Sequence, residues 1–141
     1  CENDVQILFT VSPVRHTKDG ITENQLSKSK LICALHETLP HFENCHYLPI
    51  YEIMMDDLRD YRFYKEDLIH PNNQAIQYIW EKFGNAYFSE EVKDFITENY
   101  KIKAALEHRP NDEKSPKYLE FLEKLKEKIA LQQQKVKHKI F

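Results

Sequence analysis

The chain has 141 residues and a formal net charge of −3, and 30% of its residues are charged. It lacks the surplus of basic residues that neutralises nucleic-acid phosphates, so DNA and RNA are poor candidate partners. No apolar run reaches the roughly 20 residues that cross a bilayer, so we expect no transmembrane helix and no membrane partner.

The three cysteines, Cys1, Cys33 and Cys45, are odd in number and lack Cys-x-x-Cys spacing. This pattern disfavours a disulfide framework and predicts reduced thiols in a cytoplasmic protein. The chain starts at Cys1, without a methionine, a few residues before a strand-like run. We interpret it as a fragment whose beginning is missing.

Residues 5–12 are almost continuously apolar and β-prone, which predicts a strand covered on both faces in a parallel sheet. Thr22 and Gln25 then have the spacing of a capping box, so we expect a helix from there to about Leu39. Its apolar positions, from Leu26 onward, fall on one broad face that should pack on the sheet. Residues 45–53 predict a second strand, in which Pro49 favours an edge position or a strand end.

The order of strand, helix and strand is typical of a parallel α/β sheet, whose strand C-termini meet at one edge where such folds bind ligands. Ser12 and Glu52 should both approach that edge. The polar and aromatic residues 54–69 follow, and we expect them to form a helical turn and loop over the same edge.

Three helices should complete the chain. Asn72 is the expected cap of a well-buried helix that ends at Gly84 in a left-handed conformation. Ser89 should open a second helix to about Glu107, and Ser115 a third to about residue 139. The last helix carries an apolar stripe on a charged surface, a pattern that packs against one surface or a partner helix. We therefore divide the chain into an α/β part, residues 1–88, and a charged helical extension, residues 89–141.

Asp67 and His70 have a spacing that suits catalysis. A histidine acts as general base toward a serine only when its other ring nitrogen is held in the right tautomer, and a carboxylate one turn away can hold it. The spacing alone is a weak signal. On local grounds His70 is equally well explained as a histidine that caps the turn before Pro71.

Several matches in register are more specific than one, and five segments of this chain together resemble the signatures of the GSCFA family. They are Thr10-Val-Ser-Pro-Val-Arg-His16, Asn24-Gln-Leu-Ser-Lys28, Tyr51-Glu-Ile, Asp57-Leu-Arg-Asp-Tyr-Arg-Phe-Tyr64 and Asp67-Leu-Ile-His-Pro-Asn72. The resemblance covers roughly residues 5–88. That family is similar to the SGNH/GDSL hydrolases, whose last sequence block is Asp-x-x-His before the closing helix.

The resemblance implies an α/β fold: part of the parallel sheet of an SGNH or flavodoxin-like three-layer fold, followed by C-terminal helices. It implies that His70 is the general base and Asp67 its orienting acid in an esterase that needs no cofactor. The Gly-Ser-Cys-Phe-Ala string that would supply the serine is absent from these residues. By the same resemblance the nucleophile and the oxyanion-hole donors lie upstream, so the chain alone should be inactive. The implied substrate is a small acyl ester, and esters on carbohydrates are one candidate class.

Four further residues are candidates for the substrate pocket: Ser12, Arg15, His16 and Glu52. Ser12 is a poor nucleophile because Pro13 does not suit the tight turn of a nucleophile elbow. Arg15 and His16 either bind an anionic substrate group or are solvated loop charges. Glu52 either walls the pocket or belongs to a salt-bridged surface.

No metal site is predicted, because His36, His41, Cys45 and His46 lack established zinc-ligand spacing. Two other functions stay open. One is a non-catalytic binding or assembly module, for which the terminal helix or an open strand edge could form a homodimer. The other is an acyltransferase that uses the same Asp-His pair.

Overall fold

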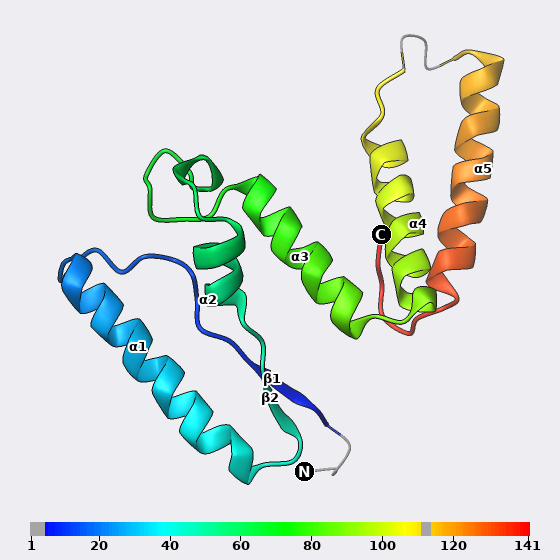
Figure 1. Ribbon diagram of the computed structural model, residues 1–141. Coiled ribbons are helices and arrows are strands. Elements are labelled where there is room, and N and C mark those ends of the chain that lie inside the picture. Colours follow the sequence, from blue (N-terminus) through cyan, green and yellow to red (C-terminus); the bar gives the residue numbers. More distant parts are fainter. Residues whose placement is uncertain (1–4, 111–113) are drawn as a thin grey trace. The chain divides into compact units, whose positions relative to one another are not determined.

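The structure is a computed structural model that describes residues 5–110 and 114–141, so Cys1 lies outside the described residues. The chain forms two compact units, Cys1–Phe83 and Gly84–Phe141, which divide within a helix. Most described residues are helical, and one small sheet lies in the first unit (Figure 1). Within the described part of the chain, no helix is long and apolar enough to cross a membrane.

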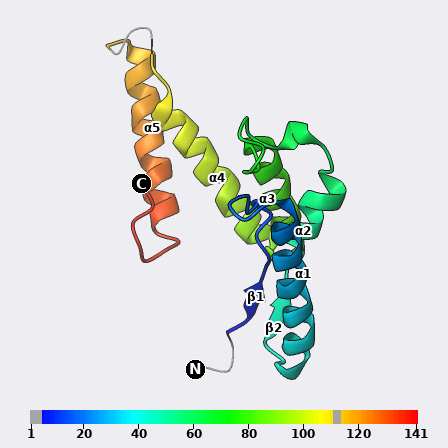
Figure 2. The ribbon, with the colours of Figure 1, turned by 90° about the vertical axis from the view of Figure 1, so that its left-hand side faces the viewer.

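The sheet consists of β1 (Ile7–Phe9) and β2 (Cys45–Tyr47), which pair in parallel with Ile7 opposite Cys45. Helix α1 (Ile21–Thr38) and the short 3-10 helix η1 (Leu39–His41) connect them, as Figures 1 and 2 show. The predicted order of strand, helix and parallel strand is therefore confirmed, and the chain is of the α/β class.

The strands are shorter and more exposed than predicted. β1 spans three residues, and the side chains of Ile7 and Phe9 are 41% and 40% exposed. The expected cover on both faces is therefore wrong for the described residues, because they provide no second layer over these positions. Only Val11, just beyond the strand, is fully buried here, at 2% exposed.

The start of α1 also differs from the prediction. Its N-cap is Gly20, with φ of 95°, and no side chain caps the helix. Glycine adopts that backbone conformation without steric cost, so the turn from Thr17 ends at Gly20 and the helix begins before the predicted capping box. The side chain of Gln25 instead accepts a hydrogen bond from the hydroxyl of Tyr51 at 3.0 Å.

The apolar face of α1 does not pack as expected, since Leu26 and Leu31 are 44% and 51% exposed. The buried residue of this helix is Lys28, at 8% exposed. An amphipathic pattern gives the face that could be buried, but burial needs a neighbouring element, and tertiary structure decides whether one is present.

The second half of the predicted second strand is helical. Pro49 is the N-cap of α2 (Ile50–Glu52), and a π-helical turn, η2 (Ile53–Asp57), continues it. Proline has no N–H to donate to a strand ladder, so pairing ends before it. Glu52 consequently lies in a helix and not at a strand end.

Helix α3 (Asn73–Tyr87) begins as predicted, because the side chain of Asn72 accepts a hydrogen bond from the backbone N–H of Ala75 at 3.1 Å. It does not end at Gly84, which is a buried position inside the helix. The helix is also less buried than predicted, since Ile76 and Trp80 are 52% and 41% exposed.

Helices α4 (Glu90–Glu107) and α5 (Pro116–Gln133) pack against each other in the second unit. The predicted caps Ser89 and Ser115 are confirmed, because each side chain accepts a hydrogen bond from a first-turn amide. The stripe on α5 is buried or half-buried, with Leu125 at 6% exposed. α5 ends at Gln133, earlier than expected.

The main apolar cluster of the first unit holds the candidate site in place. Met54 and Leu58 from the η2 region pack with Tyr64 and Ala75, all at most 8% exposed. Phe63, next to Tyr64, and Ile79 of α3 extend this cluster. The loop between η2 and α3, which carries Asp67 and His70, is thereby anchored at both ends.

Candidate active site

The candidate site is a tight turn formed by residues 67–70. One carboxylate oxygen of Asp67 accepts hydrogen bonds from the backbone N–H groups of Ile69, at 2.8 Å, and His70, at 3.0 Å. Its other oxygen lies 2.7 Å from Nδ1 of the His70 ring. The amide of His70, followed by that of Ile69 and by the His70 ring, holds the pKa of Asp67 well below its usual range. Asp67 is therefore ionised at neutral pH.

The contact with Asp67 also orients the imidazole of His70. A carboxylate accepts hydrogen bonds and does not donate them, so neutral His70 carries its proton on Nδ1 and keeps Nε2 as an acceptor. No described residue forms a hydrogen bond with Nε2. The side chain of His70 is 52% exposed and that of Asp67 is 41% exposed, which leaves His70 accessible to a reactant.

The turn includes a residue in a costly backbone conformation. Leu68 has φ of 56°, in the left-handed region that a non-glycine residue enters at a cost of roughly 1–2 kcal/mol. Backbone hydrogen bonds hold this conformation. The N–H of Leu68 donates to the carbonyl of Lys65 at 2.9 Å, and the N–H of Lys65 donates to the carbonyl of His70 at 2.8 Å. An isolated antiparallel β-bridge between Tyr64 and Pro71 closes the loop. The surroundings thus determine the position of His70 more strongly than a free surface loop would.

Arg15 connects the segment after β1 to this turn. Its backbone N–H donates to the carbonyl of Ile69 at 3.2 Å, and its Nη1 donates to the carbonyl of Leu68 at 3.1 Å. The guanidinium lies over the ring of Tyr64, 4.3 Å from the centroid, and 5.2 Å from that of Tyr61. Arg15 therefore satisfies two carbonyls of the turn and is itself held by two aromatic rings.

The other predicted pocket residues have partners away from the Asp67 turn. The hydroxyl of Ser12 accepts from the N–H of Val14 at 3.2 Å. Both carboxylate oxygens of Glu52 accept from the hydroxyl of Tyr47 at 2.9 Å, and burial together with this carboxylate raises the pKa of Tyr47. The assignment of Ser12, Arg15, His16 and Glu52 to a substrate pocket stays a prediction.

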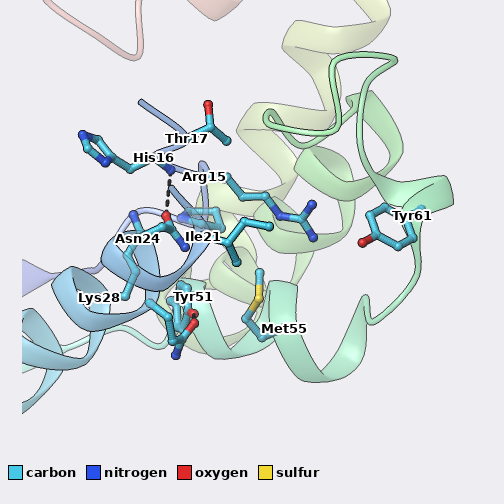
Figure 3. Close-up of a pocket in the computed structure, with 11 residues that line it drawn as sticks. Arg15, His16, Thr17, Ile21, Asn24, Lys28, Tyr51, Met55 and Tyr61 are labelled. Atoms are coloured by element: carbon cyan, nitrogen blue, oxygen red, sulfur yellow. Dashed lines mark hydrogen bonds between the residues drawn. The ribbon is translucent and has the colours of Figure 1, made fainter. Parts of the chain in front are cut away.

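A cavity of about 220 Å³ lies beside the first turns of α1 (Figure 3). Arg15 and His16 line it, together with three residues that sequence reasoning did not select as site residues: Asn24, Gln25 and Lys28. The available signal was their position in one of the segments that resemble the GSCFA signatures. Among the described residues, no group of three or more His, Cys, Asp or Glu side chains could hold a metal ion.

Comparison with known proteins agrees with the resemblance. Residues 1–83 match the model of the GSCFA family, and residues 100–140 match that of the GSCFA domain protein, C-terminal domain. No curated protein and no solved structure matches the chain. Because the first match alone spans more than half of the 141 residues, the chain belongs to the GSCFA family.

Proposed function

We propose that this chain contributes the general-base pair of a GDSL-type serine esterase, which hydrolyses small acyl esters. The observation that supports this most directly is the 2.7 Å contact between Nδ1 of His70 and the carboxylate of Asp67. A histidine whose Nδ1 is held by a carboxylate has Nε2 available for a serine hydroxyl, which is the arrangement that activates a serine nucleophile.

In the proposed reaction, Nε2 of His70 takes the proton of a serine hydroxyl as the serine oxygen attacks the ester carbonyl. Asp67 stabilises the imidazolium that forms, and His70 then gives the proton to the departing alkoxide. Water attacks the acyl-enzyme in the second half, with the same proton transfers through His70. The low pKa of Asp67 suits this role, because the carboxylate stays ionised while the histidine gains charge.

We place the nucleophile and the oxyanion-hole donors in family segments upstream of these residues. Ser12 does not fit the role, because Pro13, which follows it, does not suit the tight turn of a nucleophile elbow. The strands support a larger sheet. Ile7 and Phe9 are partly exposed, and an apolar groove of about 370 Å³ lies between the sheet region and α3. We propose that β1 and β2 are neighbouring strands of a three-layer, SGNH-like fold.

The test is labelling of the full-length protein with a fluorophosphonate probe, followed by mass mapping of the modified residue. His70→Ala should abolish labelling, and His41→Ala, which removes an exposed histidine outside the turn, is the matched control. Asp67→Asn should lower the labelling rate by roughly 10²–10⁴-fold, because general-base catalysis by His70 then lacks its orienting carboxylate.

The outcomes separate the candidate functions. Labelling of an upstream serine that depends on His70 supports the hydrolase, and transfer of the acyl group to a sugar hydroxyl instead of water would identify an acyltransferase. A folded full-length protein that the probe does not label would contradict the proposal and favour the binding or assembly module.

A further inference from the structure

We propose that the cavity beside the first turns of α1 is a binding site for a compact oxyanion, the carboxylate, phosphate or sulfate group of a ligand. Lys28 and Arg15 would supply positive charge, and the side-chain amides of Asn24 and Gln25 would supply further hydrogen-bond donors. All four line the cavity, and Figure 3 shows Asn24 and Lys28 on α1, Arg15 on the loop after β1, and Tyr51 nearby.

Lys28 is the strongest reason to expect an anion. Its side chain is only 8% exposed, and burial lowers the pKa of its amine. Its Nζ donates to the backbone carbonyl of Ser12 at 2.6 Å, which uses one of three ammonium protons. No carboxylate of the described residues pairs with it. A buried charge without a counter-ion is costly, and a bound anion would supply that counter-ion.

The two amide side chains present donors to the same cavity. Oδ1 of Asn24 accepts from the backbone N–H of His16 at 2.7 Å, and Oε1 of Gln25 accepts from the Tyr51 hydroxyl at 3.0 Å. Each acceptor oxygen is thus used within the protein. Nδ2 of Asn24 and Nε2 of Gln25 have no acceptor among the described residues, so they remain available to an oxyanion.

The lining also excludes a cation as the ligand. None of the described residues that line the cavity is Asp or Glu, whereas Arg15 and Lys28 line it; His16 also lines it, and its ring lies 3.5 Å from the carboxylate of Asp19. Arg15 uses Nη1 to hold Leu68 and keeps other N–H groups for a ligand. A volume of about 220 Å³ suits a small anionic group and a few waters.

This inference deepens the proposed function by giving the esterase a substrate with an anionic group, but binding itself does not depend on His70 chemistry. Arg15 links the two sites, because it lines the cavity and holds the Asp67 to His70 turn. Titration with anions measures binding alone, so its failure and a failure of probe labelling are distinguishable.

The experiment is isothermal titration of the full chain with inorganic phosphate, sulfate and acetate at fixed ionic strength. Gln25→Glu is the decisive variant: a carboxylate can still accept from Tyr51, but the donor is lost and a negative charge is added. It should weaken binding about tenfold or more, the size expected when a charge-assisted hydrogen bond becomes a repulsion. Lys28→Gln should have the same effect.

Two control variants change the net charge by the same amount as the two test variants: Ser29→Glu matches Gln25→Glu, and Lys30→Gln matches Lys28→Gln. Ser29→Glu and Lys30→Gln change the same charges on exposed α1 positions outside the cavity lining and should stay within about twofold of wild type, because exposed charges are screened. Circular dichroism verifies that each variant folds. If Lys28→Gln does not fold, the result for Gln25→Glu alone tests the proposal. The anion that binds most tightly, among phosphate, sulfate and acetate, identifies the ligand group. No saturable binding of any anion, or equal losses in Gln25→Glu and Ser29→Glu, would overturn the proposal.

Discussion

The backbone N–H of Arg15 donates to the carbonyl of Ile69 at 3.2 Å, one residue before His70. Two segments far apart in the sequence, the loop after β1 and the loop before α3, therefore meet at the candidate site. The Arg15 side chain makes a second contact between these segments, because its Nη1 donates to the carbonyl of Leu68. Its guanidinium lies over the ring of Tyr64. The position of His70 thus depends on a residue that takes no part in proton transfer.

Replacing Arg15 with methionine should destabilise the first unit by roughly 2.5 kcal/mol, about 1.5 for the hydrogen bond of the charged guanidinium and about 0.5 for each of two partly exposed cation–π contacts. The free energy of unfolding is measured in urea by the fluorescence of Trp80, the single tryptophan, which lies in that unit. Arg59→Met is the control, because its ion pair with Asp56 is exposed and worth less than about 0.5 kcal/mol. Equal losses in the two variants would contradict the anchoring role of Arg15.

Leu68→Asn should stabilise the first unit by about 0.5–1 kcal/mol, because asparagine tolerates the left-handed conformation that Leu68 adopts at φ of 56°. The leucine side chain is 48% exposed, so its removal costs little burial. Leu68→Val should have the opposite effect, since a β-branched side chain fits this conformation worst. Urea unfolding of both variants tests the prediction, and a destabilised Leu68→Asn would argue against a left-handed turn.

Asp67→Asn should flatten the dependence of stability on pH in the acid range. The pKa of Asp67 is lowered in the folded state relative to the ordinary value of 3.8. Asp67 therefore contributes stability that is fully present above pH 3.8 and is lost as the pH falls from there toward the folded-state pKa.

Asparagine keeps an acceptor for the amides of Ile69 and His70, so the variant should retain the turn. Its urea midpoint should fall less than that of wild type between pH 7 and acid conditions. Glu66→Gln removes the charge of a neighbouring exposed residue and serves as the control. If the urea midpoint of Asp67→Asn fell as much with pH as that of wild type, the ionised form of Asp67 would contribute no stability to the fold.

Local chemistry explains which elements were predictable from sequence. The helix caps at Asn72, Ser89 and Ser115 were correct, because a cap involves a side chain and an amide three residues away. The contact of Asp67 with His70 was predictable for the same reason, since both belong to one turn. The parallel strand pair followed from the pattern of the whole crossover.

Contacts between distant segments could not be predicted in this way. Nothing local indicates that Arg15 holds the carbonyls of Leu68 and Ile69, or that Lys28 is buried on a helix whose leucines are exposed. Residues 50–53 were expected to continue the second strand but form helical turns after Pro49, next to Met54, which is buried in the apolar cluster. Packing between distant segments sets the first two contacts, whereas Pro49 itself ends the strand and the helical turn after it places Met54 in the cluster.

Asn72 connects the candidate site to α3, and two variants can separate its two roles. Its Oδ1 caps the helix at Ala75, and its Nδ2 donates to the carbonyls of Arg62, at 2.6 Å, and Tyr64, at 3.4 Å. Asn72→Ala loses the cap and the Nδ2 bonds and should cost about 1.5–3 kcal/mol, the sum of a lost cap and a lost hydrogen-bond donor. Asn72→Asp keeps the cap and adds a favourable charge at the helix start, but a carboxylate oxygen then faces the Arg62 carbonyl, so it should still cost about 1–1.5 kcal/mol. Urea unfolding reported by Trp80 measures both variants, and equal costs would mean that the bond to Arg62, and not the cap, fixes the start of α3.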